Sequence, residues 1–122
     1  MKPIHIDFSP LPQRYQQIGD YGETPECVWF KITTFPGKPA YAMACLLHEM
    51  VERFRNQQLG ITDAEVDAFD EANQDDDDPG MLPDAPYHRT HCEADAIERM
   101  FILLAGEDWA EYTAAVDALF KE

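Results

Sequence analysis

Hydrophobic and polar positions divide this chain into a β-rich first third and a helical remainder. Residues 4–8 alternate between apolar and polar side chains, and so do residues 27–35, which are rich in β-branched and aromatic types. A period of two is typical of strands with one buried face. Residues 14–21 can supply a third strand, and the prolines and glycine of residues 36–39 then end the region. We therefore expect a small antiparallel sheet in residues 1–39.

From residue 40 onward the apolar period becomes that of helices. One helix is expected over residues 40–56 and a second long helix from about Thr90 to residue 105. The expected apolar face of the first consists of Met43, Leu46, Leu47, Met50, Val51 and Phe54, and that of the second of Ala94, Ile97, Phe101 and Leu104.

Capping signals place two shorter helices. Thr62 and Glu65 form a capping box that starts a helix over residues 63–72, and Gly60 fits the position that ends the helix before it. Asp108 is expected to start a last helix, whose aromatic residues can cover the others. The fold class is therefore α+β, a single domain over residues 1–122 with a sheet region (1–39) packed on three to four helices (40–122).

Between these helices, residues 73–86 are rich in Asp, Pro and Gly and include Asp75–Asp78, four consecutive aspartates. A calcium loop of the EF-hand type needs alternating ligands, a central glycine and a final glutamate, which are missing. We expect a mobile, solvated acidic loop without a calcium site.

The candidate chemistry begins at His48 and Glu52, which are four residues apart and share one helix face. An imidazole and a carboxylate so placed can bind one metal ion, and Glu49 can lie beside that ion as a base for water. This is the logic of the zinc-hydrolase HExxH helix, with glutamate in place of its second histidine. Both ligands are expected at the border of the apolar face. The alternative is a solvated helix with ordinary acidic residues.

A second set of ligand types lies on the helix that starts near Thr90. His91, Asp95 and Glu98 share one stripe along the border of its apolar face. If the two long helices pack together, His48, Glu52 and His91 can converge as three ligands of Zn²⁺, with a fourth position open. Glu98 or Asp95 would then be a further ligand or an acceptor that orients an imidazole. The alternative is that the histidines only line an interhelical seam.

The segments LLHEMVERF, GITDAEVDAFD and APYHRTHCEADAIERMF resemble those of a family of small phage and prophage proteins. They are similar, more loosely, to the zincin-type metallopeptidase domains of the ImmA/IrrE class, over roughly residues 40–105. The resemblance implies a zincin-like domain in which His48 is the first ligand, Glu49 the general base and a carboxylate of the following helix a further ligand. Glu52 departs from the pattern, since a histidine stands there in those domains, and His91 is additional.

Composition and charge restrict the partners. The net charge is −15, and because residues 1–39 hold four basic and four acidic residues, the whole excess lies from residue 40 onward. Such a surface repels nucleic acids and anionic membranes, and it could bind a basic site on a protein partner. No apolar run reaches the length of a membrane span and no signal peptide is present, so we expect a cytoplasmic location.

Three cysteines make an odd count without short paired spacing, which favours reduced thiols. Cys45 is expected to be a small packing residue, although Cys45 and His48 with His91 or Cys92 could form a closed structural zinc site.

Two functions follow from these patterns. The first is a zinc-dependent hydrolase acting on a peptide or protein, in which Tyr41 or Tyr87 donates a hydrogen bond to the developing oxyanion. The second is a non-catalytic acidic interaction protein of phage or mobile-element origin, including a mimic of DNA.

Overall fold

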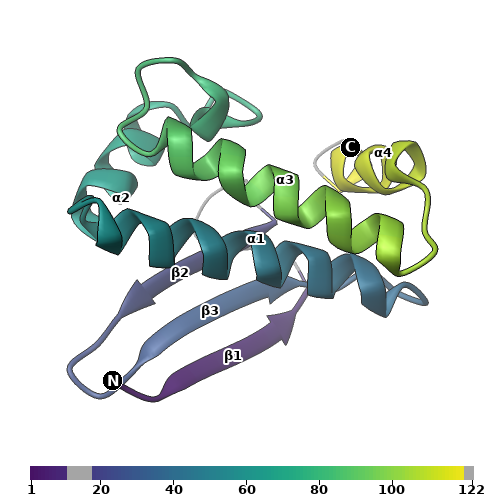
Figure 1. Ribbon diagram of the computed structural model, residues 1–122, viewed down its shortest axis with the longest axis horizontal. Coiled ribbons are helices and arrows are strands. Elements are labelled where there is room, and N and C mark those ends of the chain that lie inside the picture. The colour runs from purple at the N-terminus through teal and green to yellow at the C-terminus, as the bar shows by residue number, and fades with distance from the viewer. Residues whose placement is uncertain (11–17, 120–122) are drawn as a thin grey trace.

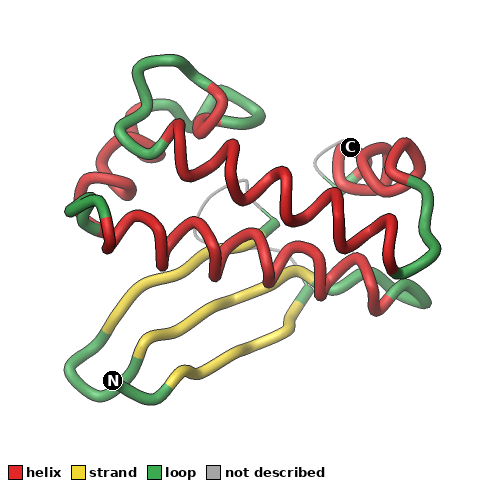
Figure 2. Tube along the Cα trace, viewed as in Figure 1, coloured by secondary structure: helices red, strands yellow, loops and turns green. Residues whose placement is uncertain are grey.

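The described residues form a three-stranded sheet with helices on one side of it (Figures 1 and 2). The computed structural model describes residues 1–10 and 18–119. The strands are β1 (Ile4–Ser9), β2 (Gly19–Glu23) and β3 (Val28–Thr33), in the spatial order β1-β3-β2. The α+β class predicted from the sequence is therefore confirmed.

The sheet is mixed, so the expectation of an antiparallel sheet is only half right. β2 and β3 pair antiparallel, but β1 and β3 run parallel, with Ile4 opposite Val28 and Ser9 opposite Thr33. β3 lies between the other two strands and runs opposite to β2. Because β2 itself runs opposite to β1, β3 is parallel to β1. The third predicted strand is found at Gly19–Glu23, and residues 14–17 of that prediction lie outside the described residues.

The helices lie close to their predicted positions along the sequence. They are α1 (Pro39–Gln58), α2 (Asp63–Ala72), α3 (His88–Leu104) and α4 (Trp109–Ala118), with a short 3-10 helix, η1 (Pro79–Met81), before α3. Thr62 caps α2 by accepting a hydrogen bond from the Glu65 N–H group, and Asp108 caps α4 in the same way from Glu111. No helix among the described residues is both long and apolar enough to cross a membrane.

Helix α1 is the centre of the molecule. It packs on β3 and β2, and α3 lies along its other side (Figure 1). Apolar packing between α1 and the sheet is built from Phe30, Ile32, Ala42 and Leu46, all of them buried. This packing fixes the direction in which the remaining side chains of α1 point.

The apolar faces predicted for both long helices are partly wrong. Phe54 is 62% exposed and Leu104 is 78% exposed, whereas His48 and Glu52, expected at a border, are only 7% and 4% exposed. Apolar periodicity locates the buried face only when the interior is apolar. Here α1 also turns a polar stripe toward α3, so the buried face includes His48 and Glu52 and leaves out Met43 and Phe54.

Candidate metal centre

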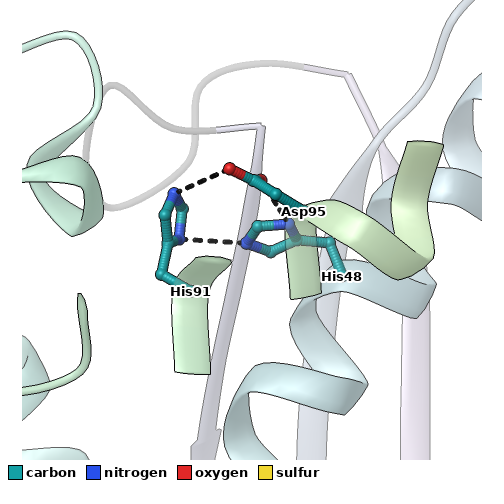
Figure 3. Close-up of side chains that lie close together, drawn as sticks. All are labelled: His48, His91 and Asp95. Carbon is teal, nitrogen blue, oxygen red and sulfur yellow. Dashed lines mark hydrogen bonds and ion pairs between the residues drawn. The ribbon is translucent and has the colours of Figure 1, made fainter. Parts of the chain in front are cut away.

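The seam between α1 and α3 holds a cluster of histidines and carboxylates. His48 comes from α1, and His91 and Asp95 come from α3; their side chains turn toward one another in Figure 3. One ligand atom of each lies within 4.8 Å of the others, so these three residues could hold a metal ion. Of the other predicted ligands, Glu52 contacts both imidazoles, and Glu98 contacts that of His48.

Three potential ligand atoms form a nearly equilateral triangle at the inner side of the cluster. His48 Nε2 lies 3.2 Å from His91 Nδ1 and 3.1 Å from Glu52 Oε2, and the His91 Nδ1 to Glu52 Oε2 distance is 2.9 Å. With ligand bonds of about 2.0–2.1 Å, the edge of a tetrahedral zinc site is about 3.3 Å. The triangle is therefore close in size to one face of such a site.

The opposite ring nitrogens face other carboxylates. His48 Nδ1 lies 2.7 Å from Glu98 Oε1 and 3.2 Å from Asp95 Oδ1. His91 Nε2 is fully buried and makes no hydrogen bond to a described residue, although Asp78 Oδ1 is 3.0 Å away. Glu98 and Asp95 therefore face the nitrogen of His48 that points away from the triangle, and Asp78 faces the corresponding nitrogen of His91.

The carboxylates favour positive charge between them. Burial alone would lower the pKa of His91, but Asp78 and Glu52 outweigh it and raise this pKa to about 10. The pKa of His48 is likewise raised well above its usual value: burial opposes the shift, and Asp95, Glu52 and Glu98 overcome it. Burial would raise the pKa of Glu52, yet the two histidines lower it to about 2. The centre accordingly favours bound protons or a cation.

Hydrogen bonds from buried tyrosines fix the carboxylates. The Tyr21 hydroxyl donates to Glu52 Oε1 at 2.7 Å and accepts from Asn56 Nδ2 at 3.2 Å. On the other side of the cluster, the Tyr112 hydroxyl donates to Glu98 Oε2. Neither tyrosine was identified from the sequence, because a tyrosine on a strand or a terminal helix reads as an ordinary core residue.

Glu49 lies on α1 beside the triangle and against β2. A Cβ atom at Gly19 would come within 2.9 Å of the Glu49 carboxylate, so glycine leaves the space that this side chain fills. Burial and the neighbouring Glu52 raise the pKa of Glu49 well above its usual value, although His48 opposes the shift. A carboxyl group with a raised pKa can exchange a proton near neutral pH.

The acidic loop contributes to the centre, which corrects the expectation that it is a solvated excursion. Pro79 and Gly80 are buried, and Asp78 reaches His91. A Cβ atom at Gly80 would lie 2.5 Å from His91 Cγ, so only glycine lets the loop pack on the imidazole face. The exposed residues Asp75–Asp77 match the predicted solvated loop. A glycine needed for close approach leaves no signal in a single sequence.

A cavity of about 450 Å³ opens onto the cluster. Its lining includes Gly19 and Tyr21 of β2, the residues of the triangle, and Asp77–Gly80 of the acidic loop. No Lys or Arg lies among its described lining residues. The cavity therefore brings solvent or a ligand to one side of an anionic site.

The secondary predictions have mixed outcomes. Tyr41 and Tyr87 were the candidates to donate a hydrogen bond to the oxyanion. The Tyr87 hydroxyl instead donates to Asp70, and Tyr41 packs edge-on against aromatic rings of the core. The sulfur of Cys92 lies 3.6 Å from Nε2 of His88, which is one helical turn earlier on α3. Cys45 is buried, as expected, and burial raises the pKa of its thiol to about 12, so it remains protonated.

No family model, no curated protein and no solved structure matches the chain. The resemblance to phage proteins and to zincin-type domains therefore stays a prediction.

Proposed function

We propose that this protein is a metal-dependent hydrolase in which His48, Glu52 and His91 hold Zn²⁺. The triangle of two imidazole nitrogens and one carboxylate oxygen is the observation that carries the proposal. Two histidines and one carboxylate are a ligand set of catalytic zinc sites, which leave a position open. Calcium and magnesium prefer oxygen ligands, so the imidazoles favour a transition metal over both.

The surrounding side chains support this assignment. Ligand histidines commonly donate their second N–H group to a carboxylate, which fixes the ring and its tautomer. Glu98 holds this position at His48, and Asp78 and Asp95 lie beside the corresponding nitrogen of His91. We therefore assign Glu98 and Asp95 to orienting the imidazoles.

When bound, the ion supplies Lewis-acid chemistry, which polarises a carbonyl group and makes water nucleophilic at neutral pH. Glu49 accepts a proton from the attacking water and passes it to the leaving group. Its position beside the triangle and its raised pKa suit both transfers. Tyr21 keeps Glu52 in place through the second carboxylate oxygen.

The neighbouring sheet edge favours an extended peptide as substrate. β2 is the outermost described strand on the side of the cavity, and Gly19 and Tyr21 contribute to the cavity wall. An edge strand can bind an extended chain by main-chain hydrogen bonds. A peptide bound there would bring a carbonyl group toward Glu49.

Glu49→Gln separates catalysis from metal binding. We expect the variant to retain zinc and its melting temperature and to lose roughly 100-fold or more in peptide hydrolysis, because general base catalysis is worth about that factor. Metal content is measured by mass spectrometry after purification, and hydrolysis with a library of unstructured peptides. Glu71→Gln, an exposed acid on α2, is the matched control.

Two outcomes would refute the proposal. Protein that binds no transition metal, even after zinc is added, excludes the metal centre. Zinc-loaded protein that cleaves no peptide, ester or amide, with Glu49→Gln indistinguishable from wild type, excludes hydrolysis and favours the acidic interaction protein.

A further inference from the structure

The sheet edge farthest from the metal centre leaves an apolar surface uncovered. Ile4, Ile6 and Phe8 of β1 are 45%, 39% and 43% exposed. The register places Ile6 beside Phe30 and Phe8 beside Ile32, so these side chains are on the sheet face that α1 covers elsewhere. The helix layer thus stops short of β1.

The nearest flank of α1 is apolar too. Tyr21 of β2 contacts Glu52, so the flank with Glu52 is turned toward β2. Met43 and Phe54 lie on the opposite flank, at helical spacing, and are 41% and 62% exposed. β1 and this flank of α1 therefore both present exposed apolar side chains, which marks a candidate surface for a partner.

The outer edge of β1 is free to pair with another strand. The carbonyl groups of Pro3 and Ser9 accept hydrogen bonds from β3, so the odd-numbered residues of this strand face β3. The N–H and C=O groups of Ile4, Ile6 and Phe8 therefore face away, and no described strand lies beyond them. An exposed apolar edge of this kind is a template for strand addition.

We propose that β1 is the centre of a twofold interface in which a second copy of this chain pairs with it antiparallel, about Ile6. In this register Ile6 faces its own copy, Ile4 faces Phe8 of the second copy, and His5 faces Asp7. The outward N–H and C=O groups then meet as hydrogen-bonded pairs, while His5 and Asp7 meet at the closer, non-hydrogen-bonded positions. The strand is complementary to itself in apolar contact, and the imidazole of His5 can donate a hydrogen bond to the carboxylate of Asp7.

The charge distribution favours the same partner. Residues 1–39 are neutral, and the whole net charge of −15 comes from the rest of the chain. A twofold axis at β1 joins the neutral sheet regions of two copies and keeps their acidic helical regions on the outside. The resulting isologous contact closes as a dimer and continues the sheet through both copies.

The test is the mass in solution at micromolar concentration, measured by light scattering and sedimentation. We expect wild-type protein at twice the 14.0 kDa of one chain. Ile6→Lys places two like charges on the axis and should weaken dimerisation by roughly 100-fold or more, since unpaired charge at an interface is strongly destabilising. Met100→Lys, an equally drastic change at an exposed apolar site of α3, should leave the dimer intact.

A charge exchange tests the register. His5→Asp sets a new carboxylate against Asp7 of the second copy and should weaken the dimer, and adding Asp7→Lys to the same chain should restore it. Circular dichroism shows that each variant is folded. A monomeric wild type, a dimer unaffected by Ile6→Lys, or a double variant no stronger than His5→Asp would overturn the proposal.

Discussion

The two flanks of α1 are organised in opposite ways. The flank toward β2 and α3 buries His48 and Glu52, whereas the flank toward β1 exposes Met43 and Phe54. Burying polar groups costs free energy unless they are paired, and exposing apolar groups forgoes the gain of burying them. A helix that does both at once has a stability cost on each side. Such costs are expected where a side has a function, and they are consistent with the metal ion proposed for one flank and the dimer surface proposed for the other.

The largest effect is expected at Glu52, on the buried flank. Glu52→Gln removes the negative charge that faces both histidines and replaces an anionic ligand by a neutral amide, so zinc binding should be abolished. The metal-free variant should lose about 3 kcal/mol of unfolding free energy, as for other broken buried charge pairs. Urea denaturation and metal analysis measure both quantities, with Glu71→Gln as the control. Unchanged zinc content would show that Glu52 is not a ligand.

Gly80→Ala should have the next largest effect, because its Cβ atom collides with the His91 ring. We expect zinc affinity to fall by roughly 10–100-fold, as for changes that disturb the support of a ligand. Competition with a chromogenic chelator measures the affinity. Met81→Ala, at an exposed residue next to it, provides the comparison. If both variants bind zinc like wild type, the loop does not position His91.

Zinc binding should release protons at pH 7. The carboxylates raise the pKa of His91 to about 10 and that of His48 well above its usual value, which favours protonated imidazoles in the metal-free protein. The metal requires neutral imidazoles, so binding should release protons, and affinity should increase as the pH rises toward 10. Calorimetry in buffers of different ionisation enthalpy counts these protons. An affinity that stays constant with pH would contradict the assignment of both histidines.

The smallest effect is expected on the exposed flank. Phe54→Gln should leave zinc content unchanged and alter the unfolding free energy of the monomer by no more than about 0.5 kcal/mol, as is usual for surface substitutions. Denaturation in the Ile6→Lys background, where the chain is expected to be monomeric, gives this number. A loss of zinc would show that the exposed flank of α1 affects metal binding on the buried flank.

The sequence alone determined the local structure. Thr62 and Asp108 start the helices that their capping signals predicted, and alternation located β1 and β3. It also placed His48 with Glu52, and His91 with Glu98, on shared helix faces. These features depend on side chains within a few residues of one another, and a single chain records such neighbours directly.

Only the tertiary structure decided which faces are buried and which residues meet. The place of β3 between β1 and β2 depends on pairing across the chain, and so does the parallel direction of β1. The contacts of Tyr21 with Glu52 and of Gly80 with His91 join residues that are far apart or separated by a loop. Apolar periodicity misplaced Phe54 because it assumes an apolar interior, and this helix instead directs its polar stripe inward, where the carboxylates and imidazoles satisfy one another.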